Sequence, residues 1–230
     1  VCSFLTVRRE IALREQEGQA YSVTGGVRIA SQLHSEPSHQ VKAVVELPQK
    51  QAMAKLAARL LLADMTIYLD AGTSTLEIVP YIKLLSGMTV VTNDFGVVQA
   101  LMDAPHVTVI HTGGQLDHSN HSCVGGLAVA TLRQVVTDIA FISTSSWDLR
   151  RGITTPSALK VEVKQVAMQS ASQVVLVASS SKYGTFSMYK IAGLEQFDVI
   201  ISDDVLAPAP ADGIRKQGVE LMLPSDPQPA

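Results

Sequence analysis

The sequence is poor in cysteine and in aromatic residues, and each shortage narrows the class of protein. Its 230 residues include two cysteines, Cys2 and Cys123, which are far apart and form no CxxC pair. A disulfide framework and a cysteine-bound metal cluster are therefore excluded, and we expect two free thiols. Only 5% of the residues are aromatic, and Val, Ile, Leu and Ala dominate the 47% that are hydrophobic. Helix-covered parallel sheets have this kind of interior, so we expect an α/β fold.

Long hydrophobic runs and a strong excess of one charge are also missing. Apolar runs such as 174–178 and 199–201 end well before the roughly 18 residues that a membrane helix needs. No basic-then-apolar leader is recognisable, so we predict a soluble, cytoplasmic protein without a membrane partner. The net charge of −3 argues against a chain that coats nucleic acid along its whole surface, although residues 1–30 hold four arginines against three glutamates.

The beginning of the chain predicts a short helix followed by a small β-ribbon. Residues 4–17 place Val7 and Ile11 on one helical face, with Ser3 as N-cap and Gly18 as the stop. Residues 19–27 alternate loosely and contain a glycine pair that suits a turn. Polar clusters and a proline then predict a linker over residues 31–47.

From residue 48 onward, helical and strand patterns alternate. Apolar β-branched runs predict seven buried strands, over residues 66–70, 88–92, 107–112, 139–144, 174–178, 199–202 and 219–223. Most of the intervals hold one amphipathic helix, and parallel neighbours need such long crossovers. We therefore predict a mostly parallel, doubly wound sheet over residues 48–224. The proline-rich residues 225–230 are expected to be a disordered tail.

The most informative segment for function follows the first predicted strand. In open α/β sheets, ligands bind beyond the carboxyl ends of the strands. There the sequence reads Asp70-Ala71-Gly72-Thr73-Ser74-Thr75, a small polar turn that opens into a helix. Backbone N–H groups and hydroxyls of such a turn can hold a phosphate or a carboxylate. The same residue types also begin an ordinary capped helix, so both interpretations stay open.

Polar residues follow other predicted strands as well. Asn93 and Asp94 come after the second strand, where they could bind sugar hydroxyls or cap a helix. Asp148 lies within a hydroxyl-rich segment after the fourth strand, and Lys182 within one after the fifth. A lysine there could neutralise a phosphate held by the first turn, or it could be a solvated loop lysine.

Metal and cofactor motifs are not evident. Asp117, His118 and His121 have possible metal-ligand spacing, but their Gly and Asn neighbours indicate an exposed loop. No GxSxG elbow, P-loop or GxGxxG fingerprint occurs. We predict neither a metal nor a cofactor.

Several motifs, in order, resemble the DeoR family of bacterial transcriptional regulators over essentially the full length. Residues 3–10, SFLTVRRE, are similar to the family's recognition helix, and residues 25–27 to its wing. Residues 70–75, DAGTST, are similar to its DAGTT or DAGTS segment. The matching motifs that follow are Thr92-Asn93, Gly113-Gly114, Gly152-Ile153-Thr154-Thr155-Pro156 and Ser181-Lys182-Tyr183-Gly184. Because the sequence begins inside what looks like the second half of a helix-turn-helix motif, part of a DNA-binding unit is expected to precede Val1.

The resemblance implies a regulator that senses a small molecule and binds operator DNA. Residues 1–30 would be the remnant of a winged helix-turn-helix, with Thr6, Arg8 and Arg9 as DNA contacts. The sensing domain would share the fold of ribose-phosphate isomerase, glucosamine-phosphate deaminase and CoA-transferase. The family implies a phosphorylated sugar or sugar acid as effector, repression of carbohydrate catabolism, and a homodimer or homotetramer. The implied effector-binding residues are Asp70, Gly72, Thr73, Ser74, Thr75, Asn93, Asp148 and Lys182.

One departure from the family pattern and two rival functions stay open. Ser179 stands where the family commonly has an aspartate, which would make the pocket less acidic and favour a more anionic ligand. A sugar-phosphate isomerase on the same fold would need a general base, with Asp148 or Asp94 as candidates. The arginine-bearing helix and the wing are unnecessary for an isomerase and favour a regulator. A degenerate interaction module would bind no ligand at all.

Overall fold

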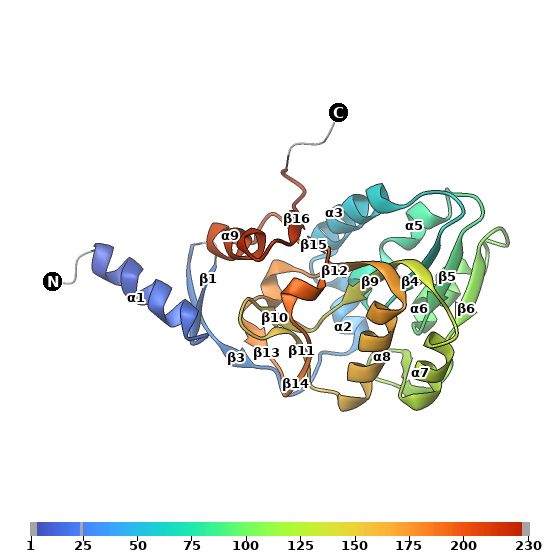
Figure 1. Cartoon of the computed structure of the whole chain (residues 1–230), viewed down its shortest axis with the longest axis horizontal. Helices are drawn as coiled ribbons and strands as arrows, with labels where there is room; N and C mark the ends of the chain where they lie inside the picture. The colour runs from blue at the N-terminus through green and yellow to red at the C-terminus, as the bar shows by residue number, and fades with distance from the viewer. Residues whose placement is uncertain (1–3, 24, 227–230) are drawn as a thin grey trace.

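The computed structural model describes residues 4–23 and 25–226. The first helix projects from the rest of the molecule, which we call the body (Figure 1). The expected N-cap, Ser3, lies outside the described residues. Within the described part, no helix combines the length and the apolar composition needed to cross a membrane.

The body is built around one seven-stranded sheet in which every neighbouring pair is parallel. Its strand order is β16-β15-β12-β9-β4-β5-β6. The strands are β4 (Thr66–Leu69), β5 (Thr89–Thr92), β6 (Thr108–His111), β9 (Thr137–Ser143), β12 (Ala171–Val177), β15 (Val199–Ile201) and β16 (Glu220–Met222). Each of the seven predicted strands is present, and the mostly parallel, doubly wound sheet is confirmed.

Helices cover both faces of this sheet, and the strand sequences explain why. Along β9, Ile139 and Phe141 enter one apolar core while Ala140 and Ile142 enter the other, because successive side chains of a strand point to opposite faces. Residues of α3 (Leu47–Ala57), α5 (Val79–Ile82) and α6 (Phe95–Leu101) pack in the first core. Residues of α7 (Gly126–Leu132), α8 (Ala158–Gln169) and α9 (Pro208–Lys216) pack in the second.

The chain changes direction between β4 and β9, the two central neighbours. From β4 it builds outward through β5 to β6, and then returns to β9 and builds outward on the other side. The turn after β4 leads into the one-turn helix α4 (Thr73–Leu76) and lies against the end of β9. A Cβ on Gly72 would stand 2.8 Å from Cβ and Oγ of Ser143. A glycine is therefore needed for this close approach, at the place where open α/β sheets bind ligands.

Short elements supplement the sheet, and the sequence did not predict them. An antiparallel sheet of order β10-β11-β14 lies beside the main sheet, and β7 pairs with β8 in a hairpin. Strands of two to four residues are too short to show a hydrophobic period. They are β7 (Gln115–Asp117), β8 (Ser122–Val124), β10 (Ser146–Asp148), β11 (Gly152–Thr155), β13 (Thr185–Phe186) and β14 (Tyr189–Ala192), and the 3-10 turns are η1 (Ala58–Leu60), η2 (Ser180–Lys182) and η3 (Leu194–Gln196).

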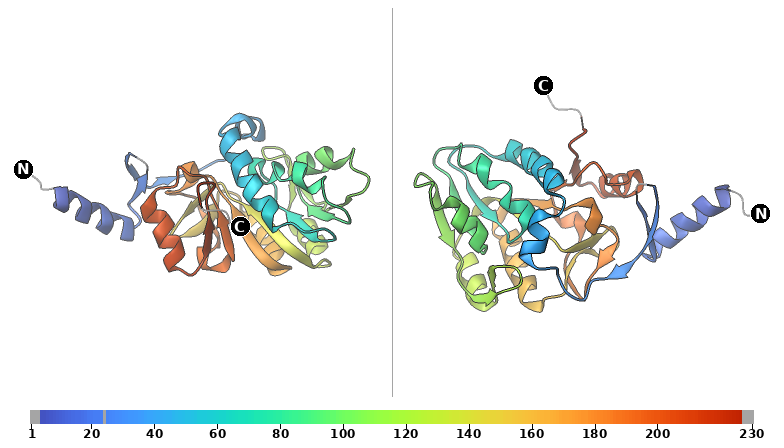
Figure 2. Two further views of the ribbon diagram at one scale, coloured as in Figure 1. Left: turned by 90° about the horizontal axis from the view of Figure 1, so that it is seen from above. Right: turned by 180° about the vertical axis from the view of Figure 1, so that it is seen from behind.

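The N-terminal segment has the predicted helix and ribbon. Helix α1 (Phe4–Gln16) is followed by the antiparallel pair β1 (Ala20–Val23) and β2 (Gly26–Ile29). Both views in Figure 2 show α1 projecting from the body at the end that carries the first strands. The ribbon, in contrast, lies against the body, because Tyr21 is buried there.

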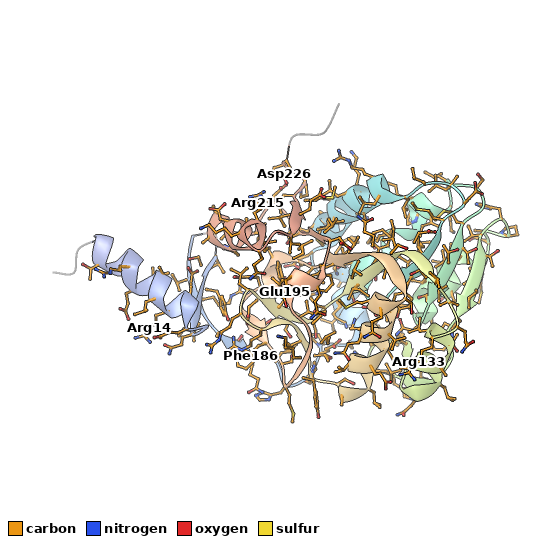
Figure 3. The ribbon with its side chains drawn as sticks, viewed as in Figure 1. Arg14, Arg133, Phe186, Glu195, Arg215 and Asp226 are labelled. Carbon is orange, nitrogen blue, oxygen red and sulfur yellow. The ribbon has the colours of Figure 1, made fainter. Side chains whose placement is uncertain are left out.

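The interval expected to be a linker, 31–47, is structured along part of its length. It contains β3 (Ser31–Gln32), which pairs in parallel with β13, and α2 (His39–Val44). The expected tail starts with contacts: Ser225 N donates to Asp204 Oδ1 at 2.8 Å, and Arg215 lies 3.7 Å from the Asp226 carboxylate (Figure 3). Residues 227–230 lie outside the described residues.

Candidate functional site

A narrow cavity of about 30 Å³ lies where the carboxyl ends of β4 and β9 meet. Its walls include residues 71–74 after β4 and residues 143–145 after β9. Four lysine side chains also line it: Lys42, Lys160, Lys164 and Lys182. Four lysines that line one cavity, at the place where the order of the strands reverses, favour an anionic ligand. We call this space the anion cavity.

A buried ion pair forms the floor of this site. Lys164 Nζ contacts the carboxylate of Asp70, and the side chains of both residues are almost fully buried. The backbone N and the Oγ of Ser143 donate to the same carboxylate at 2.9 and 2.8 Å, while Lys164 Nζ also donates to Ser143 O at 2.9 Å. Asp70 thus joins the end of β4 to the end of β9 and to α8, and its carboxylate is occupied within the protein.

Side chains from the next strand hold the turn in position. Asn93 Oδ1 accepts hydrogen bonds from Ala71 N and from the Tyr68 hydroxyl, both at 3.0 Å. Asp94 accepts from Gly72 N at 3.0 Å and also caps α6 through the N–H groups of its first turn. Asn93 therefore orients the turn from behind, and Asp94 is a helix cap rather than the general base of an isomerase.

The hydroxyls of the turn have different tasks. Thr75 Oγ1 donates to the carbonyls of Asp70 and Gly72, at 2.7 and 2.8 Å, so it stabilises the turn itself. Thr73 and Ser74 line the cavity. Ser74 is 2% exposed, and among the described residues its Oγ has no hydrogen-bond partner. A buried hydroxyl without a partner is costly, which makes Ser74 a candidate donor to a ligand.

Lys182 reaches the cavity from the loop after β12. Its Nζ donates to Thr144 O at 2.9 Å. Burial, together with the charges of Lys42 and Lys50, lowers the pKa of Lys182 to about 8. The carboxylates of Glu36 and Glu46 act in the opposite direction. The ammonium group is therefore mostly charged at neutral pH, but its proton is held less firmly than in a solvated lysine.

Four charged residues of the cavity were missed in the sequence. Lys160 and Lys164 are four residues apart on α8, a spacing that places both on one helix face directly after a hydroxyl-rich strand end. That signal could have identified them. Lys42 and Glu36 belong to the interval treated as a linker, and nothing in their local sequence indicates a contact with the sheet.

The structure does not bring Asp148 to the cavity. Asp148 is fully buried, and its Oδ2 accepts from the Tyr21 hydroxyl and from Arg151 Nη1, each at 2.9 Å. Arg151 Nη1 also donates to the Tyr21 hydroxyl at 2.9 Å, and Tyr21 packs edge-on against Tyr183. This cluster fastens the N-terminal ribbon to the body. A carboxylate used in this way is not placed to act as a general base on a ligand of the anion cavity.

Ser179 and the possible metal ligands Asp117 and His121 were also singled out in the sequence, and the structure shows what surrounds each of them. Ser179 is fully buried and is not among the residues that line the cavity, so a ligand there would not contact it directly. Asp117 lies 3.2 Å from Lys160 Nζ and accepts from Ser119, and His121 stacks on His39 with ring centroids 4.9 Å apart. Within the described residues, no group of three or more His, Cys, Asp or Glu side chains could hold a metal ion.

The predicted DNA contacts lie on the projecting helix. Thr6 and Arg9 of α1 are exposed, while the side chain of Arg8 lies outside the described residues. Arg14, near the end of α1, is paired instead with Glu10 at 3.0 Å (Figure 3). Helix α1, which projects from the body, therefore carries an exposed hydroxyl and an exposed guanidinium group.

Comparison with known proteins connects these features with regulation. Residues 45–204 match the family described as DeoR C terminal sensor domain. The chain is 42% identical over 221 residues to the uncharacterized HTH-type transcriptional regulator YgbI of Escherichia coli (strain K12), covering 96% of this chain and 86% of that protein. It is 30% identical over 223 residues to the putative aga operon transcriptional repressor of Escherichia coli O157:H7, covering 96% and 83%. It is also similar to ribose 5-phosphate isomerase A from Methanocaldococcus jannaschii, with a TM-score of 0.42, 15% identity, and coverage of 58% of this chain and 53% of that one.

The buried pair of Asp70 and Lys164 yields a stability prediction. Asp70→Asn leaves the Lys164 charge without its counterion, so we expect a loss of about 3–5 kcal/mol in the free energy of unfolding, measured by urea denaturation. Lys164→Met has a comparable effect, and the double variant loses clearly less than the sum of the two. The control is Glu162→Gln, which removes the exposed pair with Arg133 (Figure 3) and costs less than about 1 kcal/mol. Strictly additive losses would show that the two charges do not interact.

Proposed function

The chain belongs to the DeoR family of transcriptional regulators, and on this premise we propose that it is a repressor of carbohydrate catabolism genes that responds to a phosphorylated sugar or sugar acid. Membership makes the chain a DNA-binding transcriptional regulator, not an enzyme. In the proposal, residues 48–224 sense the effector, residues 1–30 contact operator DNA, and residues 31–47 connect the two.

The observation that carries the proposal is the anion cavity itself. Within the part of the chain that the structure describes, the Ser74 hydroxyl is buried without a partner, and the ammonium group of Lys182 lines the same space. A phosphate offers several acceptor oxygens and a negative charge, which match a hydroxyl donor and a cation whose hydrogen bond goes to a neutral carbonyl, Thr144 O. Hydroxyls and amides around the cavity, such as Thr73, Ser145 and Asn120, suit the hydroxyl groups of a sugar.

Repression and assembly are supported by other observations. Two relatives are named as repressors, one of them the putative aga operon repressor. Large apolar side chains on and near α5 and α6 are exposed, with Leu84 at 81%, Phe95 at 43% and Met102 at 75%, and others are exposed elsewhere on the chain. Such side chains favour burial between copies of the chain, in accord with a homodimer or homotetramer.

Ligand binding tests the sensing part of the proposal. We expect ribose 5-phosphate, 6-phosphogluconate or a related ester, at about 100 times its Kd, to stabilise the protein by roughly 2.7 kcal/mol in thermal unfolding. Ser74→Ala removes the donor aimed at the ester and should weaken binding about tenfold. The matched control is Ser179→Ala, an equally buried hydroxyl without a partner that does not line the cavity. Equal weakening by both variants would argue against an anion site at Ser74.

The pH dependence of the same binding tests the role of Lys182. Phosphate esters lose their last proton near pH 6 and Lys182 loses its own near pH 8, so binding is strongest between these values. Raising the pH from 7 to 9 deprotonates Lys182 and should weaken binding about tenfold in calorimetric titration. In Lys182→Met binding is weak and nearly independent of pH over this range. Lys190→Met, at an exposed lysine of β14, should keep the profile of the unchanged protein. A pH-independent affinity in the unchanged protein would contradict the assignment.

DNA binding by the full-length protein tests the regulatory part. After selection of its binding sequence from a random duplex library, Arg9→Ala should lower the affinity by about 1–3 kcal/mol, measured by fluorescence anisotropy at fixed salt. Arg133→Ala removes the same charge at the opposite end of the molecule (Figure 3) and should have little effect. Equal effects of the two substitutions would mean that α1 makes no specific contact with DNA.

A further inference from the structure

We propose that Glu36 is a tethered competitor within the anion cavity, and that the effector carries a second negatively charged group which replaces the Glu36 carboxylate on Lys42 and Lys160. This inference rests on the proposed function and deepens it. It defines the ligand as a molecule with anionic groups at both ends, and it assigns a release step to the segment that joins the sensor to the DNA-binding end. We call residues 33–38, between β3 and α2, the strap.

The geometry of Glu36 is that of a bound anion. Its two carboxylate oxygens contact different lysines, with Oε2 3.1 Å from Lys42 Nζ and Oε1 3.1 Å from Lys160 Nζ. The side chains of all three residues are at most 18% exposed. Burial by itself raises the pKa of Glu36, but Lys160 and Lys42 together lower it to about 2. The group is therefore ionised at neutral pH and fully engaged.

The size of the cavity shows that the strap must move when a ligand enters. Ligand sites usually measure about 300–1,000 Å³, whereas the cavity of about 30 Å³ has room for little more than a water molecule. Glu36 and Lys160 also line a neighbouring groove of about 470 Å³. Lys42 and Lys182 line another one of about 220 Å³. The strap and α2 thus divide a space that could hold a sugar phosphate, and withdrawal of Glu36 would join the cavity to the larger groove.

Charge balance determines what can replace Glu36. Lys164 keeps Asp70 as its counterion, and Lys160 keeps Asp117 at 3.2 Å. Among the described residues, the acceptor that Lys42 Nζ keeps is neutral, Asn120 Oδ1 at 2.6 Å. When the strap leaves, one negative charge is missing at this end of the cavity. A carboxylate or a second phosphate on the ligand restores it, whereas a neutral hydroxyl leaves the lysine pair without compensation.

The strap is connected to the N-terminal ribbon by the chain itself. β2 ends at Ile29, and β3 follows directly and pairs with β13. At the start of the strap, Leu33 N donates to Phe186 O at 2.7 Å. Glu36 lies three residues after Leu33, whose backbone hydrogen bond anchors the chain that leads to the ribbon. A displacement of Glu36 therefore takes place close to this anchor.

The test compares ligands that differ in one end group only. The pairs are glycerol 3-phosphate with 3-phosphoglycerate, erythritol 4-phosphate with 4-phosphoerythronate, and ribitol 5-phosphate with 5-phosphoribonate. In each pair a terminal hydroxymethyl group is replaced by a carboxylate, and three lengths are used so that one can span both anion positions. Affinities are measured by calorimetry for the unchanged protein, for Glu36→Gln and for Glu162→Gln.

For the pair of matching length, we expect the carboxylate form to bind the unchanged protein at least tenfold more tightly. Glu36→Gln removes the competitor but keeps its shape, so the affinity for the carboxylate form should rise at least another tenfold, and that for the polyol phosphate less than threefold. Glu162→Gln makes the same change at an exposed carboxylate, which pairs with Arg133 and lines neither the cavity nor the two grooves, so its effect should stay below threefold.

Hydrogen exchange provides an independent measurement of the strap. In the unchanged protein, the carboxylate ligand should accelerate exchange within residues 33–38, and the polyol phosphate of equal length should not. The inference would be overturned by equal affinity for the two members of every pair, or by an unchanged affinity in Glu36→Gln. If binding still depended on Ser74 in that case, the proposed function would stand. Failure of all six compounds to bind either protein would refute the proposed sensing function, and the inference with it.

Discussion

The contact between Asp70 and Lys164 is the constraint on which the site depends. It lies where the sheet changes direction, and it joins the end of β4, the end of β9 and the face of α8 through a few atoms. Two buried charges of this kind are stable only as a pair, so the helix and both strand ends keep one relative position. The turn after β4 can then expose Thr73 and Ser74 to the cavity, because Asp70 and Thr75 hold it from within.

The sequence predicted the sheet well because buried parallel strands are continuous apolar runs, and all seven such runs became strands of the main sheet. It also identified the polar turn at residues 70–75, whose composition is unusual at a strand end. The short antiparallel strands were not predicted, since segments of two to four residues are too short to show a hydrophobic period. The charged residues that complete the site were missed for a different reason. Glu36 contacts Lys160 although the two are 124 positions apart in the sequence, and local sequence patterns do not indicate contacts over such a separation.

Asp148 shows how a correct emphasis on strand ends can still misplace a residue. Its segment does follow β9, but β10 and β11 carry it away from the cavity and toward the N-terminal ribbon. There it accepts from Tyr21 and from Arg151, and Arg151 in turn lies 4.2 Å from the ring centroid of Phe186 (Figure 3). The carboxylate that was expected to meet a ligand instead joins the two parts of the protein that a regulator has to coordinate.

The loop after β12 has a consequence of its own. Its Lys182 lines the cavity, the adjoining Tyr183 packs on Tyr21 of the ribbon, and Ser181 O accepts from Arg28 at 2.8 Å. If ligand binding at Lys182 and DNA binding near the ribbon are coupled through this loop, the coupling free energy is the same in both directions. If a small molecule in the cavity loosens the grip on an operator, then the operator must loosen the grip on the small molecule by the same factor. Protein bound to its operator would therefore need a higher concentration of the small molecule than protein free in solution. The affinity of the DNA-bound form would then determine the concentration at which the promoter responds.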